Sequence, residues 1–187
     1  MLRKIRTPED VEKSRKKKQM LVGIVLVLLM VVSTAGFSLM SGDDEGEESV
    51  VEELGMKFYW QGGIWKTQIG EQVYAFQFLP SEVDNVSVNG SFNLGEYSGE
   101  PLYFVGSAEG VSEVLSNIGR YALRYQGACL NESVCEDNYP VKSCGDNLIV
   151  FEEGNETMVY RNESCVYLVG DSVKSADAFL YKVLKIK

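Results

Sequence analysis

The feature that most constrains this chain is an uncharged, largely apolar run of 21 residues from Met20 to Met40. Folded as an α-helix, a run of this length is about 31 Å long, close to the ~30 Å hydrocarbon core of a bilayer. A helix buried in a protein core is usually shorter and amphipathic, so the run favours a transmembrane helix. We therefore expect a single-pass protein that contacts membrane lipid through residues 20–40.

The charges on either side of the run predict its orientation. Residues 1–19 carry eight Lys and Arg against three acids, whereas residues 41–55 carry seven acids and no base. The positive-inside rule then leaves the basic tail, residues 1–19, in the cytoplasm beside anionic lipid headgroups and the rest of the chain extracytoplasmic. A cleaved export signal is the alternative, because Ser33 and Ala35 have the spacing of an A-x-A-like cleavage site.

The remainder divides into an acidic linker, residues 41–55, and one extracytoplasmic domain, residues 56–187. The linker is rich in acids with Gly and Ser, so we expect it to be extended and to bury nothing. Residues 41–187 carry 24 acids and 10 bases, a net charge of −14. Nucleic acid is an improbable partner for such a domain, because phosphate contacts require clustered Lys and Arg.

All four cysteines follow the span, and an even number in an exported domain predicts two structural disulfides. Of the three possible pairings we favour Cys129–Cys135, which closes a short loop, and Cys144–Cys165, which ties two strand ends together. The chain has no C-x-x-C motif and no histidine, so we expect no metal site and no cofactor. Five N-x-S/T sequons are either glycosylation sites or polar turns, and they lie at Asn85, Asn89, Asn131, Asn155 and Asn162.

The domain opens with a stretch that predicts a three-stranded meander, MKFYWQGGIWKTQIGEQVYAFQF. Gly62-Gly63 suits a type I′ turn and Gly70-Glu71 a type II′ turn. Two such turns set the register, so that Trp60 faces Trp65 and Trp65 faces Phe76. One face of the meander is then apolar and aromatic while the other is mostly polar, as a half-buried sheet requires. We expect both tryptophans in the core; a sugar-binding aromatic platform is the alternative if they are exposed.

Further along, PLYFV (101–105) predicts a strand, residues 106–127 a helix of 3.6-residue period, and residues 147–153, 157–161 and 165–170 three strands. Residues 175–187 predict an amphipathic helix with Ser175 as its cap, suited to docking on the sheet or to a lipid surface. Strands in blocks with two helices predict an α+β domain, in which both helices pack on a mostly antiparallel sheet.

No catalytic motif emerges from this order of elements. The passage GSAEG, between a strand and a helix, is similar to a nucleophile elbow, but Val105 stands where a glycine is required. Without histidine no Ser-His-Asp triad can form, so Ser107 is interpreted as an N-cap.

Several runs carry a resemblance: W-K-T-Q (65–68), Y-A-F-Q-F-L-P-S-E-V (74–83), N-E-S-C-V (162–166) and A-D-A-F-L-Y-K-V-L-K-I (176–186). Together with the single span and the order Cys129, Cys135, Pro140, Cys144 and Gly170, they make the chain similar to short uncharacterised membrane-anchored proteins of small-genome archaea. That resemblance implies a cell-surface domain in an archaeal envelope, and it implies no site.

Two functions of different classes follow. The first is a non-catalytic, membrane-tethered surface or envelope protein whose domain binds a protein or glycan partner. The second is an extracytoplasmic hydrolase using a pair of carboxylates, which requires two such groups about 5–10 Å apart with one raised pKa. A thiol oxidoreductase is a lesser alternative.

Overall fold

A computed structural model describes residues 17–31, 49–130, 135 and 138–187. The chain divides into two compact units, Met1–Glu47 and Glu48–Lys187. In the first unit, residues 17–31 form an α-helix whose side chains are exposed. Among the helices of the described residues, none combines the length and apolarity needed to cross a membrane. The expected span at 20–40 continues into residues 32–40, which lie outside the described part.

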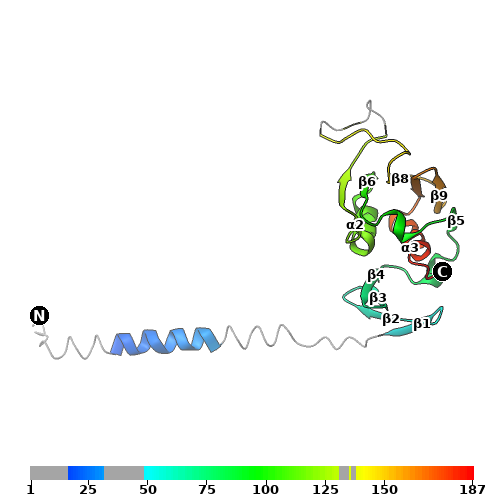
Figure 1. Cartoon of the computed structure of the whole chain (residues 1–187). Helices are drawn as coiled ribbons and strands as arrows, with labels where there is room; N and C mark the ends of the chain where they lie inside the picture. Colours follow the sequence, from blue (N-terminus) through cyan, green and yellow to red (C-terminus); the bar gives the residue numbers. More distant parts are fainter. Residues whose placement is uncertain (1–16, 32–48, 131–134, 136–137) are drawn as a thin grey trace, which may run out of the picture. The chain divides into compact units, whose positions relative to one another are not determined.

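The described residues of the second unit form two sheets and two α-helices (Figure 1). The four-stranded antiparallel sheet has the order β1 (Val50–Glu53), β2 (Met56–Gln61), β3 (Ile64–Ile69), β4 (Gln72–Phe76). The six-stranded sheet has the order β5 (Ser87–Asn89), β9 (Met158–Asn162), β10 (Cys165–Val169), β8 (Leu148–Glu152), β6 (Pro101–Val105), β7 (Arg124–Gly127). The helices are α2 (Ala108–Ile118) and α3 (Ser172–Val183), with 3-10 turns η1 (Pro80–Val83) and η2 (Leu94–Glu96).

The α+β class is confirmed, and so is an antiparallel sheet at the start of the domain. A single, mostly antiparallel sheet was the wrong expectation. In the six-stranded sheet β6 is parallel to β7 and β8, β8 is parallel to β10, and β5 is parallel to β9, so that only β9 and β10 pair antiparallel. The reason is that α2 and the long segment after β7 each return the chain to the same end of the sheet before the next strand begins, which is how parallel neighbours arise.

The meander has the predicted register. Trp60 pairs with Trp65 across the first turn and Trp65 pairs with Phe76 across the second. Gly62 and Gly63 both have positive φ, as a type I′ turn requires, and Gly70 has φ +61°. Phe58, Thr67, Tyr74 and Phe76 are buried on the predicted apolar face.

The acidic linker is shorter than predicted, because Val50–Glu53 form β1 and pair antiparallel with β2. A turn at Leu54 and Gly55, both with positive φ, joins the two strands. Val51 lies opposite Phe58 and packs against the core. The acids indicated a solvated linker, but exposure alternates along β1: Val50 and Glu52 are exposed whereas Val51 and Glu53 are half-buried, as in an edge strand with one covered face.

The helix predicted over 106–127 ends early. α2 stops at Ile118 with Gly119 as its C-cap, and residues 124–127 form β7 instead. Val114 and Ile118 are buried as predicted, whereas Tyr125, assigned to the same helical face, is exposed. Ala122, Leu123 and Arg124 are good helix formers, so local propensity favoured the helix while pairing with β6 decides the strand.

The last helix starts earlier than predicted. Asp171, not Ser175, is the N-cap, and its carboxylate accepts from the backbone N–H groups of Val173 and Lys174. Ser175 and Asp177 are instead fully buried inside α3, along with the apolar residues Ala176, Phe179, Leu180 and Val183. The helix therefore docks within the domain and leaves little apolar surface for lipid.

The main core lies between the two sheets, with α2 and α3 as the middle layer. Tyr181 of α3 stacks on Phe76 at 4.4 Å and meets the edge of Phe58, both from the small sheet. Phe104, Phe151 and Leu168 face the helices from the large sheet. The opposite face of the large sheet carries a smaller cluster around Tyr103, Leu148, Val150 and Cys165, next to the disulfide-bonded segment.

Candidate functional site

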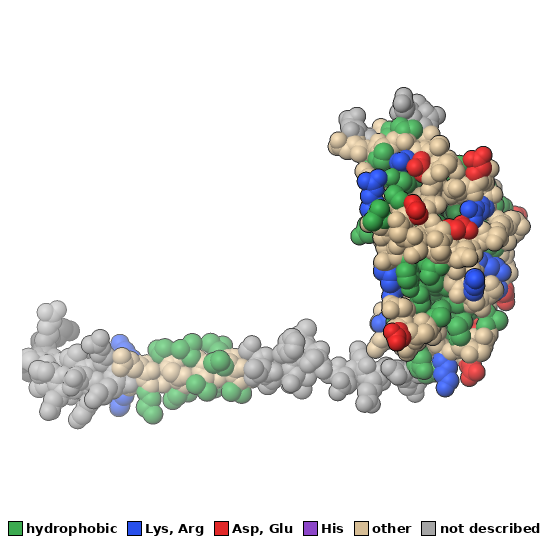
Figure 2. Space-filling model, viewed as in Figure 1, with side chains coloured by type: hydrophobic (Ala, Val, Ile, Leu, Met, Phe, Trp, Pro, Cys, Tyr) green, Lys and Arg blue, Asp and Glu red, His purple; other side chains and the backbone are tan. Residues whose placement is uncertain are grey.

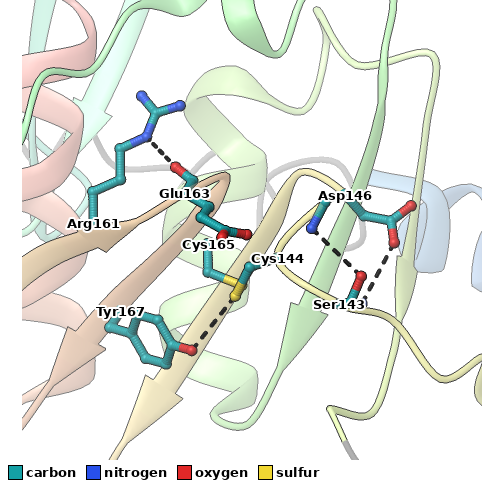
Figure 3. Close-up of a disulfide and its surroundings, with 8 residues drawn as sticks. Ser143, Cys144, Asp146, Arg161, Glu163, Cys165 and Tyr167 are labelled. Carbon is teal, nitrogen blue, oxygen red and sulfur yellow. Dashed lines mark hydrogen bonds between the residues drawn. A yellow bond between two sulfur atoms is a disulfide. The ribbon is translucent and has the colours of Figure 1, made fainter.

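Both predicted disulfides are present, Cys129–Cys135 and Cys144–Cys165. Figure 3 shows the second one joining the segment before β8 to the first residue of β10, with the Tyr167 hydroxyl 3.7 Å from Cys144 Sγ. Cys165 is fully buried and Cys129 nearly so. Cys129–Cys135 therefore closes a loop just after β7, and Cys144–Cys165 fastens the segment before β8 to β10, which are structural roles.

Four of the five sequon asparagines are exposed, namely Asn85, Asn89, Asn155 and Asn162. The fifth, Asn131, lies outside the described residues. Glycosylation stays a prediction, and these four side chains are accessible to it.

Two carboxyl groups that no sequence pattern linked meet inside the core. Glu113 of α2 and Asp177 of α3 interact through their side chains, and only 8% and 0% of their surfaces are exposed. Asp177 Oδ2 accepts from the backbone N–H groups of Gln77 and Phe78 at 3.0 and 2.8 Å. Its Oδ1 is buried with no partner that donates a proton.

Protonation of Asp177 explains this arrangement. Burial, followed by the charge of Glu113, raises the pKa of Asp177 from 3.8 to about 9. Burial also raises the pKa of Glu113, although the hydrogen bonds with Asp177 and Gln77 oppose that rise. At neutral pH Asp177 is thus protonated, and its Oδ1 hydroxyl donates to Glu113, so that the buried oxygen has a partner.

This pair joins α2, α3 and the segment just after β4, and its geometry does not fit a glycosidase-like pair. A glycosidase-like pair needs two carboxyl groups that substrate can reach, with room for a sugar and in some cases a water between them. Here one oxygen of Asp177 is occupied by backbone N–H groups and the other faces Glu113. Two described surface hollows are lined by other residues, around Lys187 and Asp84. Within the described residues, no three acidic or cysteine side chains converge as metal ligands would.

The expectation that both tryptophans lie in the core is wrong for Trp60, which is 39% exposed, and Trp65 is only half-buried. Their rings are 5.0 Å apart at the end of the β2–β3 hairpin. The two strands carry these residues on the inward face, but the rings lie near the Gly62-Gly63 turn, where they are only partly covered. Partly exposed aromatic rings are the kind of feature that a sugar-binding platform requires.

A second exposed feature lies at β7, the edge strand of the large sheet. The Ala128 N–H donates to Phe104 of β6, whereas Cys129 pairs in the other direction: its N–H donates to Pro140 and its carbonyl accepts from Lys142. Backbone groups of successive residues in a strand point to opposite sides. The N–H and C=O of Tyr125 and Gly127 therefore point away from β6, as those of Cys129 do.

Apolar side chains gather along this edge, with exposed fractions of 39–70% for Leu123, Tyr125, Leu130, Tyr139 and Val141. We call these five residues the β7 surface. A Cβ at Gly127, on the same face as Tyr125, would lie 2.9 Å from the Tyr139 ring. Tyr139 thus occupies the place of a side chain at 127, which makes the two tyrosines neighbours. Figure 2 shows hydrophobic and basic side chains together along the edge where β7 runs in Figure 1.

The electrostatics of this edge differ from those of the whole domain. Residues 114–130 contain Arg120 and Arg124 and no acid. Arg124 donates to the Tyr103 hydroxyl at 2.9 Å, and neither arginine forms a salt bridge within the described residues. Burial favours the neutral phenol, but hydrogen bonds with Lys142 and Arg124 lower the pKa of Tyr103. Arg124 is therefore a positive charge on β7 with no acidic partner among the described residues, although the sequence of the adjoining loop contains Glu132, Glu136 and Asp137.

Sequence reasoning missed the β7 surface because the strand was assigned to a helix. A signal was present in the sequence: Gly119 ends the apolar period of α2, and Arg-Tyr-Gln-Gly then leads to a cysteine loop.

Comparison with known proteins identifies no relative: no family model, no curated protein and no solved structure matches the chain.

Proposed function

We propose that this protein is a non-catalytic surface or envelope protein, tethered to the membrane through residues 20–40, whose outer domain binds a protein partner through the β7 surface. The observation that carries the proposal is the gathering of five exposed apolar side chains on one sheet edge and the adjoining disulfide loop. Exposed apolar patches with polar rims are typical of protein interaction sites.

The two disulfides are a second observation that supports this proposal. Cys129–Cys135 closes the loop that carries Leu130, and Cys144–Cys165 fixes the following segment to β10. Restraining a loop before binding reduces the entropy lost when a partner docks. Arg124 and Tyr125 are adjacent, and arginine and tyrosine are enriched among the residues that dominate the binding energy of protein interfaces.

The test is site-specific photo-crosslinking of the full-length protein in intact cells of its source. A crosslinking amino acid replaces Tyr125 or Tyr139 in separate variants, and Tyr59 in the control. Tyr59 is also 39% exposed but lies on the small sheet. We expect one and the same partner protein to be captured from positions 125 and 139 and not from position 59.

The substitution Arg124→Glu, which reverses the charge beside Tyr125, should reduce this capture while leaving the domain folded. Equal capture from all three positions, or capture from none, would contradict the proposed function.

A glycan partner is the second candidate, and the exposed Trp60–Trp65 pair favours it. These are the only two tryptophans of the chain, so intrinsic tryptophan fluorescence reports on this hairpin alone. Titration with oligosaccharides released from the source envelope should shift the emission if sugar rings stack there, and Trp60→Ala should weaken binding. An unchanged emission spectrum would remove this candidate and leave the protein-binding proposal standing.

A further inference from the structure

We propose that the partner binds by strand addition: an extended segment bearing acidic residues pairs with the outer edge of β7 and continues the large sheet. This inference rests on the proposed function, because it names the chemistry of the partner at the same surface. Main-chain pairing at an exposed sheet edge is an established mode of peptide recognition, in which backbone hydrogen bonds give affinity and side chains give selectivity.

The backbone geometry supplies the first support. Tyr125 and Gly127 direct their N–H and C=O groups outward, and within the described residues no hydrogen bond satisfies them. The next outward-facing residue after Gly127 is Cys129. Its backbone already bonds to the chain's own residues 140–142, through the parallel bridge with Val141. The outer edge of β7 is therefore able to pair with another strand. Within the described residues, the protein itself pairs on this side only at Cys129, just after β7.

The other edge strand of the same sheet is less suitable. β5 spans three residues, Ser87–Asn89, and two sequon asparagines lie in or beside it, Asn85 and Asn89. A short edge strand, especially one that carries glycans, resists pairing with other chains. β7 lacks these protections: it has no proline, no lysine and no sequon.

Charge defines the partner's composition. Arg124 is exposed, has no acidic partner among the described residues, and lies on the face of the sheet opposite Tyr125. A glutamate or aspartate directly across the strand pair would complete a cross-strand ion pair, and an apolar residue on the other face would cover Tyr125 and Tyr139. The fitting sequence therefore alternates acidic and apolar residues.

The experiment measures hydrogen–deuterium exchange of the full-length protein in lipid nanodiscs. The probe is an end-capped hexapeptide alternating Glu and Val, and the control peptide replaces each Glu with Lys. We expect the acidic peptide to slow exchange at residues 124–127, and the basic peptide to leave it unchanged.

Two variants at one position separate backbone from side-chain binding. Tyr125→Ala removes the ring but keeps the outward N–H, whereas Tyr125→Pro removes both. Proline is tolerated at an edge position whose N–H faces solvent, so the strand should persist. We expect Tyr125→Pro to bind the acidic peptide about fivefold more weakly than Tyr125→Ala, the value of one net hydrogen bond.

Two results together support strand addition: the acidic peptide slows exchange at residues 124–127, and Tyr125→Pro binds this peptide more weakly than Tyr125→Ala does. Equal affinity of the two variants, equal protection by the basic peptide, or no protection at all would overturn it. If crosslinks from positions 125 and 139 still captured the same partner in cells, the β7 surface would remain a docking site that uses side chains alone.

Discussion

Two edge strands of the domain, β4 of the small sheet and β7 of the large sheet, differ in how their outward backbone groups are covered. On β4, the Asn117 amide both accepts from and donates to Ala75, at 2.9 and 2.7 Å, and Arg120 donates to the Val73 carbonyl. Asp177 then covers the N–H groups of Gln77 and Phe78 just beyond the strand. On β7, no side chain among the described residues covers the outward groups of Tyr125 and Gly127.

This difference indicates that the outer edge of β4 is part of the domain core, whereas the outer edge of β7 is accessible to another chain. Unpaired edges invite association with other chains, so proteins usually cover or charge them. The polar groups of α2 and α3 that cover β4 are among the most deeply buried in the domain, including Asn117 and Asp177 at 0% exposure. A protein that covers one edge so fully and leaves the other bare has the second edge free for a partner.

The largest expected effect comes from uncovering β4. Asn117→Ala leaves the N–H and C=O of Ala75 without partners at the interface with α2, and each unsatisfied group costs about 1–3 kcal/mol. We expect a loss of about 3 kcal/mol in the free energy of unfolding, measured by urea denaturation. The matched control on the bare edge, Tyr125→Ala, should change it by less than about 0.5 kcal/mol. Similar losses for both variants would remove the distinction between the edges.

The second prediction concerns pH at the covered edge. The pKa of Asp177 rises from 3.8 to about 9 on folding, so between these values the folded protein holds a proton that the unfolded chain releases. The contribution of Asp177 to stability is therefore full at acidic pH and decreases as the pH approaches 9.

Asp177→Asn should abolish most of this dependence, because the amide donates permanently to Glu113 and its oxygen still accepts from Gln77 and Phe78. We expect the wild type to lose about 2 kcal/mol relative to the variant between pH 6.5 and pH 8, at about 1.4 kcal/mol per pH unit, by urea denaturation at each pH. A wild-type stability that rose from pH 5 to pH 8, with no change in the variant's slope, would show that Asp177 is ionised.

Most of the covered edge's surroundings could be predicted from sequence. Two glycine turns fixed the register of β2, β3 and β4, and the inward positions of that meander carried the aromatic residues. These are local signals, since a turn type and a period of two need no knowledge of the rest of the chain. The disulfide pairing was also predicted, and so were the three strands after the cysteine loop.

The parts that failed depend on tertiary contacts. Ala122, Leu123 and Arg124 are helix formers by local propensity, and pairing with β6 makes Arg124–Gly127 a strand. The contact of Asp177 with Glu113 was not predicted, because nothing near Asp177 in sequence indicates an acid of another helix. Neither the coverage of β4 nor the exposed outer edge of β7 could therefore be predicted from sequence, since each depends on tertiary contacts with residues distant in the chain.

A smaller effect tests whether Tyr139 flanks the bare edge. Gly127→Ala would place a Cβ 2.9 Å from the Tyr139 ring, so that the ring must move away from β7. Because Tyr139 is exposed and can move, we expect a cost of only about 1 kcal/mol in thermal unfolding. In the control Gly145→Ala, the new Cβ meets only Ser143 Oγ, at 3.6 Å, and stability should be unchanged. Equal stability of the two variants would mean that Tyr139 does not rest on Gly127.

The smallest effect on stability compares the two arginines. Arg120 binds Gln72 and the Val73 carbonyl and lies 5.2 Å above the Tyr74 ring, so Arg120→Met should cost about 1 kcal/mol. Arg124 has one described hydrogen bond, to the Tyr103 hydroxyl, and Arg124→Met should stay within about 0.5 kcal/mol.

The distinguishing readout for Arg124 is the titration of Tyr103, followed by NMR of a ring-labelled sample. Burial raises the pKa of Tyr103, and hydrogen bonds with Lys142 and Arg124 more than offset that rise. Removing Arg124 should therefore move the pKa of Tyr103 upward, whereas Arg120→Met should leave it in place. If Arg124→Met were instead the more destabilising variant, the guanidinium would belong to the fold of β7 and would not be free to meet an acidic strand.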